Sequence, residues 1–542
     1  MKLRASNIAK LKHQAFDVLI VGGGINGAVA AAALAGRGVS VALIDRGDFA
    51  GFTSQHSSNL AWGGIKYMES GEFGLVRKLC MSRNHLIRSY PSTIREIRFF
   101  TTVQRGFRWH PLLLWLGCWL YWLIGNGFTR VPRLKPRRVI EQEEPVINTD
   151  DVIGGFEYSD AYFYDNDARF VFNFIRTALN YGGIAANYVE SLGARRMPAG
   201  KDFEWHTQAR DGVSGERFTI RSRVLINAAG AFVDAHNRLT GETTEYRHVL
   251  SKGIHLVVDH VTPNRRVLAF FADDGRLFFA IPMGTRTCIG TTDTRVDSPF
   301  VQVTDEDRRF VLDNINKRLR LPRPLTMADV VAERCGVRPL AVKAAKNGDD
   351  GGDTDFLQLS RKHAIELNRA HRHVSIFGGK LTDCLNVGDE ISDAVHKLGV
   401  RIPHPGFRWY GEPPDAIREE FRHQAQLMNL DGYTAPESSE PLSRRLWRRY
   451  GAQAIGLLEN IREDPREAEV LIKGTEYIRC ELRQAARREM IVKLDDFLRR
   501  RSKIALVERR EVIRAAPGLM DACRILFGDE AQAKFDEYFR EH

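Results

Sequence analysis

Cysteine is scarce in this chain: there are seven among 542 residues, and no two of them form a CxxC pair. Structural zinc and iron–sulfur centres are usually held by closely spaced cysteines, so no metal site is predicted. Isolated cysteines are also typical of a reducing compartment. The N-terminal residues lack the unbroken apolar core of a secretory signal. We therefore expect the protein on the cytoplasmic side of the cell membrane or in the cytoplasm.

Long hydrophobic runs are missing as well. The most apolar segment, Pro111–Ile124, is shorter than the roughly 20 residues that a bilayer-spanning helix needs. Two interpretations of this segment stay open. It fits a helix buried in the core. It also fits the membrane interface, where tryptophan rings and flanking cations such as Arg108 and Arg130 lie at headgroup level.

Acidic residues are too few to balance the basic ones, and 79 Lys and Arg against 68 Asp and Glu leave a net charge of +11. This charge permits nucleic acid, anionic lipid or an anionic substrate as a partner. No nucleic-acid recognition module is present, so no nucleic-acid partner is expected. Arginines crowd around Trp447, and residues 478–498 have the apolar spacing of one amphipathic helix with a basic opposite face. We interpret these arginines as a solvated face, with attraction to an anionic membrane as the alternative.

The strongest motif lies in residues 17–45. A strand leads into Gly22-x-Gly24-x-x-Gly27, an alanine-rich helix and a second strand that ends on Asp45. In a dinucleotide site the first glycine allows a tight turn, the second lets the backbone approach a pyrophosphate, and the third lets the helix pack closely on the strand. The pyrophosphate would lie at the helix N-terminus, and Asp45 would accept hydrogen bonds from a ribose. This order of elements predicts dinucleotide binding.

The rest of the chain alternates between two architectures. Buried strands that end in small residues recur at residues 223–230 and 373–379, whereas residues 251–294 alternate like antiparallel strands. We predict an α/β fold with a Rossmann-type domain built from separated segments, an inserted antiparallel β-rich substrate domain and a C-terminal all-α cap domain. The predicted boundaries are 14–95, 165–240 and 365–400 for the Rossmann-type domain, 96–164 for a substrate- and membrane-proximal segment, 241–364 for the β-rich domain and 401–542 for the helical domain.

Short motifs recur in a fixed order along the chain: TSQHSS at 53–58, GGIKYME at 63–69, INAAG at 226–230, SKGIH at 251–255, IGTTD at 289–293, GVRPL at 336–340 and FGGKLT at 377–382. With the N-terminal DVLIVGGGINGA, this set resembles the FAD-dependent glycerol-3-phosphate dehydrogenases of the glycine/D-amino-acid oxidase superfamily. Residues 480–502 look like the helical cap domain of that family. The resemblance implies FAD as the cofactor, oxidation of sn-glycerol 3-phosphate to dihydroxyacetone phosphate, and electron delivery to a membrane quinone.

Candidate site residues can be chosen for this chemistry. An anionic phosphate ester needs fixed positive charge, which Arg338 can supply as a fork and Lys66 or Lys380 as point charges. His255 is the candidate base, because histidine titrates near neutral pH. Lys380 and Thr382 lie where a Gly-Gly turn meets a helix N-terminus, which suits the negative charge of reduced flavin. The residues expected to bind FAD are Gly22, Gly24, Asn26, Gly27, Asp45, Thr53, Ser54, Ser57, Ser58, Val189, Ala229, Gly230, Gly379, Lys380 and Thr382.

The chain departs from the family pattern near the expected substrate. Trp62 stands in place of a histidine, Lys66 in place of an arginine, and Asp383-Cys384 in place of Thr-Tyr. Lysine lacks the planar two-pronged donor of arginine. We expect a membrane-associated glycerol-3-phosphate dehydrogenase. The alternative is a related flavin oxidase or dehydrogenase for another small hydroxy or amino acid, with oxygen or quinone as acceptor. The sequence leaves self-association as a homodimer open.

Overall fold

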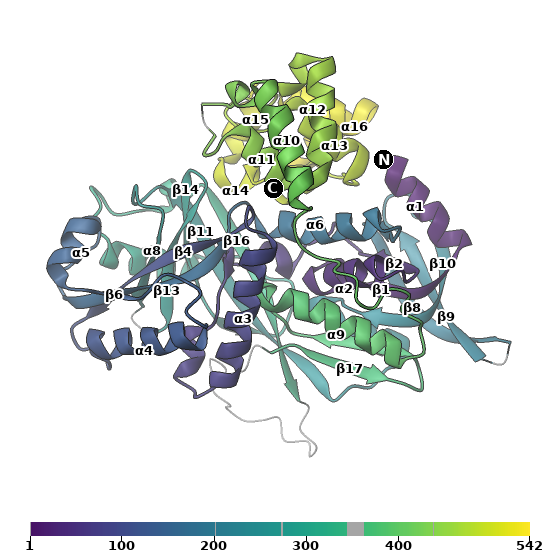
Figure 1. Cartoon of the computed structure of the whole chain (residues 1–542), viewed down its shortest axis with the longest axis horizontal. Coiled ribbons are helices and arrows are strands. Elements are labelled where there is room, and N and C mark those ends of the chain that lie inside the picture. The colour runs from purple at the N-terminus through teal and green to yellow at the C-terminus, as the bar shows by residue number, and fades with distance from the viewer. Residues whose placement is uncertain (1, 201, 273–274, 344–361, 437, 542) are drawn as a thin grey trace.

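The computed structural model describes residues 2–200, 202–272, 275–343, 362–436 and 438–541. Two sheets lie next to each other, and a body of helices lies above them (Figure 1). The chain enters the first sheet in three separate stretches and forms the second sheet between them. This arrangement confirms the predicted α/β fold with a split sheet domain, a β-rich domain and a C-terminal helical domain.

The first sheet is mainly parallel. Its strand order is β17-β18-β10-β1-β2-β7, with the strands β1 (Ala15–Val21), β2 (Val41–Ile44), β7 (Ile184–Ala186), β10 (Arg217–Asn227), β17 (Ala364–Asn368) and β18 (His373–Phe377). Strand β1 pairs in parallel with both β10 and β2. In such sheets ligands bind beyond the carboxyl ends of the strands, so the turn after β1 lies where a dinucleotide is expected.

Both faces of the first sheet are covered. Helix α2 (Ile25–Gly36) packs against α6 (Asp167–Asn180) and α9 (Cys384–Lys397) on one face. The other face carries α1 (Lys2–His13) together with the strands β8 (Val189–Ala199) and β9 (Asp202–Asp211). Burial on two faces explains why these strands read as continuous apolar runs in the sequence.

The second sheet is mainly antiparallel, apart from the parallel pair β4–β12. Its order is β15-β11-β14-β13-β12-β4-β6-β3, with β16 also on β11 and β5 also on β6. Its strands are β3 (Leu60–Ala61), β4 (Ile94–Gln104), β5 (Arg133–Lys135), β6 (Val152–Phe163), β11 (Tyr246–Asp259), β12 (Val267–Phe271), β13 (Leu277–Met283), β14 (Arg286–Gly290), β15 (Thr294–Val296) and β16 (Ala332–Lys343). Two distant parts of the chain therefore build one sheet.

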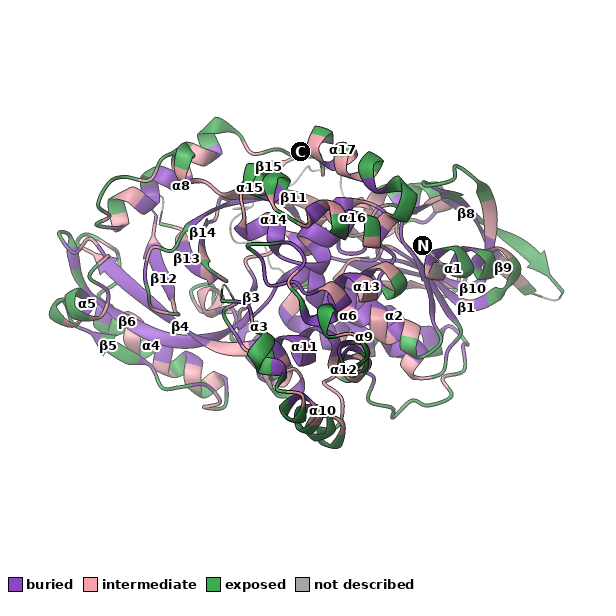
Figure 2. Cartoon of the chain, turned by 90° about the horizontal axis from the view of Figure 1, so that it is seen from above, coloured by how far each residue is buried: buried purple, intermediate pink, exposed green. Residues whose placement is uncertain are grey.

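Helices α3 (Phe73–Ser89), α4 (Pro111–Ile124), α5 (Arg137–Glu143) and α8 (Asp305–Arg318) are associated with the strands of this second region. Helix α7 (Val233–Thr240) instead contacts β8, β10 and β18 of the first sheet. The helical domain above the sheets consists of α10 (Asp415–Leu427), α11 (Leu442–Tyr450), α12 (Ala454–Glu463), α13 (Arg479–Arg488), α14 (Ile504–Val507), α15 (Arg510–Ala515), α16 (Leu519–Phe527) and α17 (Ala531–Glu541). Figure 2 shows the buried strands of both sheets running beneath it.

The prediction of one amphipathic helix over residues 478–498 is wrong. Helix α13 ends at Arg488, and Met490 has a left-handed backbone with φ 52°. An L-residue in this region cannot continue a right-handed helix. The apolar spacing persists beyond the break because both segments face the same core of the helical domain.

The interpretation of the C-terminal arginines as a solvated face is wrong for Arg449 and Arg501. Arg449 and Arg501 are only 1% and 2% exposed. Arg449 pairs with Asp165 through Nε at 3.0 Å and with Glu481 through Nη1 at 2.8 Å. Arg501 Nη1 lies 2.8 Å from Asp48. Buried charges need partners of opposite sign, and here the partners join the helical domain to the first sheet.

Helix α4 is not the buried core helix that one interpretation expected. Its inner side carries Cys118 and Tyr121 against the second sheet. Its outer side exposes five leucines, which are 45–61% accessible in the free chain: Leu112, Leu113, Leu116, Leu120 and Leu123. None of the helices formed by the described residues is long and apolar enough to span a bilayer. A contiguous exposed apolar face of this kind marks an interaction surface.

Candidate functional site

The turn after β1 brings backbone atoms into very close contact. A Cβ on Gly27 would lie 1.8 Å from the Gly22 carbonyl oxygen, and a Cβ on Gly22, where φ is +110°, would lie 2.4 Å from the Ala228 carbonyl oxygen. Gly24 is the N-cap of α2, and Ser54 Oγ accepts a hydrogen bond from Ile25 N at 3.0 Å. The turn therefore presents a helix N-terminus, one of whose N–H groups already bonds to Ser54, and helix N-termini are ready anion-binding elements.

Asp45 lies beside this turn at the end of β2. Its Oδ2 accepts a hydrogen bond from Gly23 N at 2.6 Å and its Oδ1 accepts one from Gly47 N at 2.8 Å. Burial raises the pKa of Asp45 to about 6, against these two hydrogen bonds, which act to lower it. Each carboxylate oxygen can accept a further hydrogen bond. Asp45 therefore has both the position and the acceptor capacity to bind a ribose.

Strands β11 and β16 bring His255 and Arg338 to one face of the second sheet. Gly253 of β11 pairs with Gly336 of β16. His255 is two residues from Gly253, and Arg338 is two residues from Gly336. Side chains two residues apart on a strand point to the same face, so His255 and Arg338 share a face. A Cβ on Gly253 would lie 2.2 Å from Nη2 of Arg338. The guanidinium therefore lies flat over a glycine, where Nη2 donates to Thr291 Oγ1 at 2.9 Å.

His255 is a buried histidine, and one of its two ring nitrogens is hydrogen-bonded. Its Nε2 lies 3.1 Å from Ser58 Oγ, and its Nδ1 is buried without a hydrogen-bond partner. Burial and the nearby charges of Arg334 and Arg338 hold the pKa of His255 well below its usual value. The imidazole is therefore neutral at neutral pH, which is the form that can accept a proton.

The turn after β18 places Lys380 against aromatic rings. Gly378 N donates to His248 Nε2 and the Gly378 carbonyl accepts from Asn26 Nδ2, both at 2.9 Å, so the turn is tied to α2. The ammonium of Lys380 lies 4.3 Å from the ring centre of Tyr67 and 6.0 Å from that of Trp62. Trp62, a departure from the family pattern, therefore lies beside a predicted site lysine.

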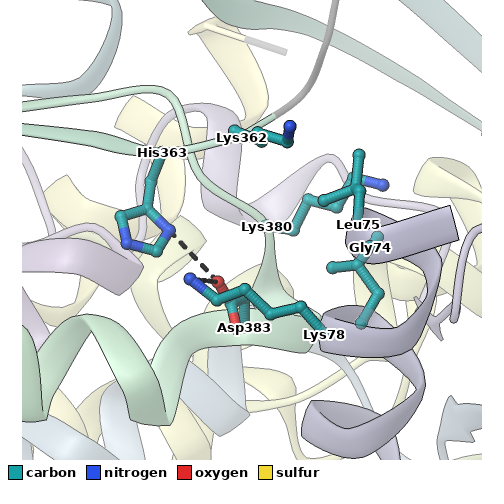
Figure 3. A pocket seen from close by; sticks show the side chains of 8 residues that line it. Gly74, Leu75, Lys78, Lys362, His363, Lys380 and Asp383 are labelled. Carbon is teal, nitrogen blue, oxygen red and sulfur yellow. Dashed lines mark ion pairs between the residues drawn. The ribbon is translucent and has the colours of Figure 1, made fainter. Parts of the chain in front are cut away.

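Lys380 also lines a cavity of about 340 Å³, which Figure 3 shows from close by. Its wall is formed by the start of α3 and by the segment that leads into β17. His363 Nδ1 lies 3.1 Å from Asp383 and its Nε2 lies 2.7 Å from Glu390. Lys78 Nζ lies 3.2 Å from the same Asp383. Asp383, another departure from the family pattern, is therefore held between two cationic groups.

We expect the stability contributed by His363 to fade above neutral pH. Burial acts to lower the pKa of His363, but the hydrogen bonds to Asp383 and Glu390 outweigh it and raise the pKa to about 9. The contribution is full below the unfolded value of about 6.5 and is lost as the pH rises to about 9, with a ceiling of roughly 3 kcal/mol. The difference in melting temperature between the wild type and His363→Gln should therefore be larger at pH 6 than at pH 9.5. An equal difference at both pH values would contradict the charged state of His363.

Comparison with known proteins decides the family. The family of FAD-dependent oxidoreductases matches residues 17–355, which is more than half of the chain. The protein belongs to this family. FAD is its cofactor, and the resemblance seen in the sequence is confirmed. The C-terminal domain of alpha-glycerophosphate oxidase matches residues 347–533, over the helical domain of this oxidoreductase.

The relatives carry one name. A glycerol-3-phosphate dehydrogenase of Mycobacterium leprae is 28% identical over 539 residues, which cover 98% of this chain and 88% of that protein. Glycerol-3-phosphate dehydrogenase 2 of Mycobacterium tuberculosis is 28% identical over 520 residues, 93% of this chain and 83% of that protein. Among solved structures, the glycerol-3-phosphate dehydrogenase from Bacillus halodurans complexed with FAD superposes with a TM-score of 0.71 at 23% identity, over 100% of this chain and 97% of that chain.

The predicted FAD residues of the oxidoreductase gather around the turn after β1, but their hydroxyl groups have different partners. Thr53 Oγ1 donates to the Val337 carbonyl at 2.7 Å, next to Arg338. Ser57 donates from both N and Oγ to Asp167. Val189 is fully buried and its N donates to the Asp45 carbonyl.

Two further predicted FAD residues, Ala229 and Gly230, follow β10, which ends at Asn227. A Cβ on Gly230 would meet no atom within 4 Å, so the backbone there faces open space. Thr382 Oγ1 donates to the Trp62 carbonyl at 3.3 Å. Lys66 lies in the short helix Ile65–Met68, next to the Tyr67 ring that Lys380 contacts. The glycine backbone, the N-terminus of α2 and the Asp45 carboxylate together fit the pyrophosphate and ribose of FAD.

Sequence reasoning missed the buried pair Arg334–Asp167. Arg334 Nη2 lies 2.7 Å from Asp167 Oδ2, and both side chains are at most 1% exposed. Asp167 also accepts from Ser57, so the pair joins β16, α6 and the TSQHSS segment. Arg334 is two residues from the GVRPL motif, and Asp167 follows the α6 N-cap Asn166. The sequence contains one indication of this pair: Asp167 is a charged residue at the start of a helix in an otherwise apolar region.

Proposed function

We propose that this FAD-dependent oxidoreductase oxidises sn-glycerol 3-phosphate to dihydroxyacetone phosphate. The observation that carries the proposal is the shared face of β11 and β16, where a guanidinium lies over Gly253 beside a buried neutral histidine. The names of the relatives support the same substrate. Arg338 binds the phosphate as a fork, and Lys66 and Lys380 add positive charge from the turns that meet at Tyr67.

The reaction removes a hydride from C2 of the substrate and a proton from its hydroxyl group. FAD, when bound, supplies the two-electron acceptor for the hydride. His255 accepts the hydroxyl proton: Ser58 holds its ring through Nε2, and its lowered pKa keeps it neutral but makes it a weaker base than the histidine of ordinary pKa expected from the sequence. Arg338 and Arg334 then disfavour a lasting positive charge on the imidazole, so the proton passes on readily to solvent or product.

A second substrate class has one observation in its favour. Trp62 packs beside Lys380, and its indole adds bulk where the family pattern has a histidine. A related small hydroxy or amino acid would then be the substrate. Anaerobic titration of the purified enzyme separates the two proposals. Glycerol 3-phosphate should bleach the flavin absorbance fully, and glycerol, D-lactate and glycine should not. Bleaching by an unphosphorylated substrate alone would reject the phosphate ester.

We propose a membrane quinone as the electron acceptor and α4 as the membrane contact. Helix α4 presents its leucines outward on the far side of the molecule from the helical domain (Figure 1). The exposed residues Trp109, Val131 and Leu134 extend the apolar area, and arginines flank it. A short apolar helix with tryptophans and basic flanks suits the headgroup region of an anionic bilayer.

Placing charge on α4 should release the enzyme from membranes. Leu116→Glu with Leu120→Glu should lower the partition coefficient on phosphatidylglycerol vesicles by about 100-fold or more, because each leucine loses about 1.5–3 kcal/mol of apolar burial. The protein should stay yellow. Leu427→Glu, which charges an exposed leucine of α10, is the matched control and should bind vesicles normally. Sedimentation with vesicles measures both, and undiminished binding of the α4 variant would reject this contact.

A further inference from the structure

A second basic cavity lies away from the catalytic face, between the helical domain and the segment that joins α3 to β4. It has a volume of about 290 Å³. Four guanidinium groups and one carboxylate line it: Arg95, Arg418, Arg422, Arg444 and Glu412. Arg422 and Arg444 are exposed and Arg95 and Arg418 are half-buried, so the site presents positive charge to an anion that arrives from solution.

Two of these arginines differ from the others in their ion pairing. Among the described residues, no acidic side chain lies within ion-pair distance of Arg95 or Arg444. Arg95 instead lies 4.0 Å from the ring centre of Tyr164. Within the described part of the chain, Arg95 and Arg444 are therefore positive groups without an ion pair, and Arg444 is open to solvent.

The other polar groups of the cavity point to a missing acceptor. Arg418 pairs with Asp415 through Nη2 at 2.8 Å, and its buried Nε, which has no hydrogen-bond partner, lies 3.8 Å from Glu419 Oε1. Glu412 is already in use, because it accepts from Ser92 N at 2.7 Å and from Trp447 Nε1 at 3.3 Å. The cavity thus offers hydrogen-bond donors, whereas the Glu412 carboxylate is already hydrogen-bonded to residues of the cavity wall.

We propose that this cavity binds a small phosphate ester, with Arg95 and Arg444 as the anion-binding pair. Guanidinium groups match phosphate oxygens through paired hydrogen bonds. Phe421 and Trp447, with ring centres 5.6 Å apart, provide an apolar wall for the organic part. The volume suits a small metabolite. The proposal is independent of the reaction on β11 and β16.

Helix α10 lies at the outer edge of the helical domain (Figure 2), and α4 lies below that domain on the second sheet (Figure 1). We assign a soluble ester to the cavity, and vesicle binding by the cavity variants separates it from a lipid headgroup. A bound ester would contact the helical domain through Arg444 and the second sheet through Arg95, so it should stabilise the junction between them.

The test uses the FAD-loaded enzyme and inorganic phosphate as the probe, in low salt. Calorimetric titration should show two sites in the wild type, one of them altering the flavin spectrum. The double variant Arg95→Gln with Arg444→Gln should lose at least tenfold in affinity at the spectrally silent site only. Arg466→Gln with Arg524→Gln removes the same charge from exposed positions of the same domain and should bind as the wild type does. Phosphate should also raise the melting temperature of the wild type more than that of the double variant.

Three outcomes would overturn the proposal. They are equal phosphate binding by the wild type and the double variant, equal effects of chloride and phosphate at matched ionic strength, and loss of phosphatidylglycerol vesicle binding as the main effect of the double variant. Arg95→Lys with Arg444→Lys keeps the charges without the fork and should retain part of the affinity, which separates a binding defect from misfolding. Loss of the spectrally active site alone would bear on the proposed reaction and not on this cavity.

Discussion

Arg338→Ala should lower kcat/KM for glycerol 3-phosphate by roughly 10²- to 10³-fold while the protein stays yellow. Among the predicted phosphate ligands, Arg338 is the one whose guanidinium packs directly on the backbone of Gly253. Its Nη2 also donates a hydrogen bond to Thr291 Oγ1. Removing one partner of a desolvated charge pair costs about 2–5 kcal/mol, and each 1.4 kcal/mol is a factor of ten. The loss should appear mainly in KM, because the phosphate is bound equally in the ground and transition states.

The control for Arg338 is Arg295→Ala on β15, which like β16 pairs with β11, and whose Arg295 side chain is exposed. Its kcat/KM should stay within about twofold of the wild type, since surface substitutions rarely disturb a site. Arg338→Lys should recover part of the lost affinity through its charge alone. If oxidation of unphosphorylated glycerol fell by the same factor as oxidation of glycerol 3-phosphate, Arg338 would not bind the phosphate.

Local patterns were enough to predict the first sheet and its cofactor turn. Residues 17–45 form a strand, a turn, a helix and a second strand, in the order predicted from the glycine motif. This prediction worked because each of these elements is determined by residues close together in the sequence. Helix α4 begins and ends where its apolar run does, at Pro111 and Ile124. Its environment could not be predicted in the same way. An apolar helix is equally consistent with a core and with a surface, and the choice depends on whether another element covers it.

The arginines of the helical domain show where sequence reasoning fails. Arg449 and Arg501 read as a solvated or membrane-facing surface, yet they are buried against Asp165 and Asp48. These partners lie hundreds of residues earlier in the chain, so no local pattern joins them. The roles of Ser57 and Ser58 are similar: their motif predicted FAD contacts, but their hydroxyl groups meet Asp167 and His255. Whether Ser57 and Ser58 also contact FAD stays a prediction.

Gly27→Ala should yield a colourless protein. Its new methyl group would lie 1.8 Å from the Gly22 carbonyl oxygen, far inside van der Waals contact, and both sides of that contact are backbone. The turn must move, and with it the helix N-terminus that is expected to hold the pyrophosphate of FAD. Overpacking of this kind costs about 1–3 kcal/mol in stability, so we expect a folded but less stable protein with almost no absorbance near 450 nm.

The matched control for this loss is Gly456→Ala in α12. Gly456 is also a helical glycine, but a Cβ there would meet no atom within 4 Å. The change should keep the full flavin content and slightly raise stability, because alanine is the better helix former by about 1 kcal/mol. The ratio of flavin to protein absorbance, with circular dichroism for folding, measures both variants. A yellow Gly27→Ala protein with one flavin per chain would show that the turn after β1 does not hold the cofactor, since a close approach of backbone to pyrophosphate cannot survive that displacement.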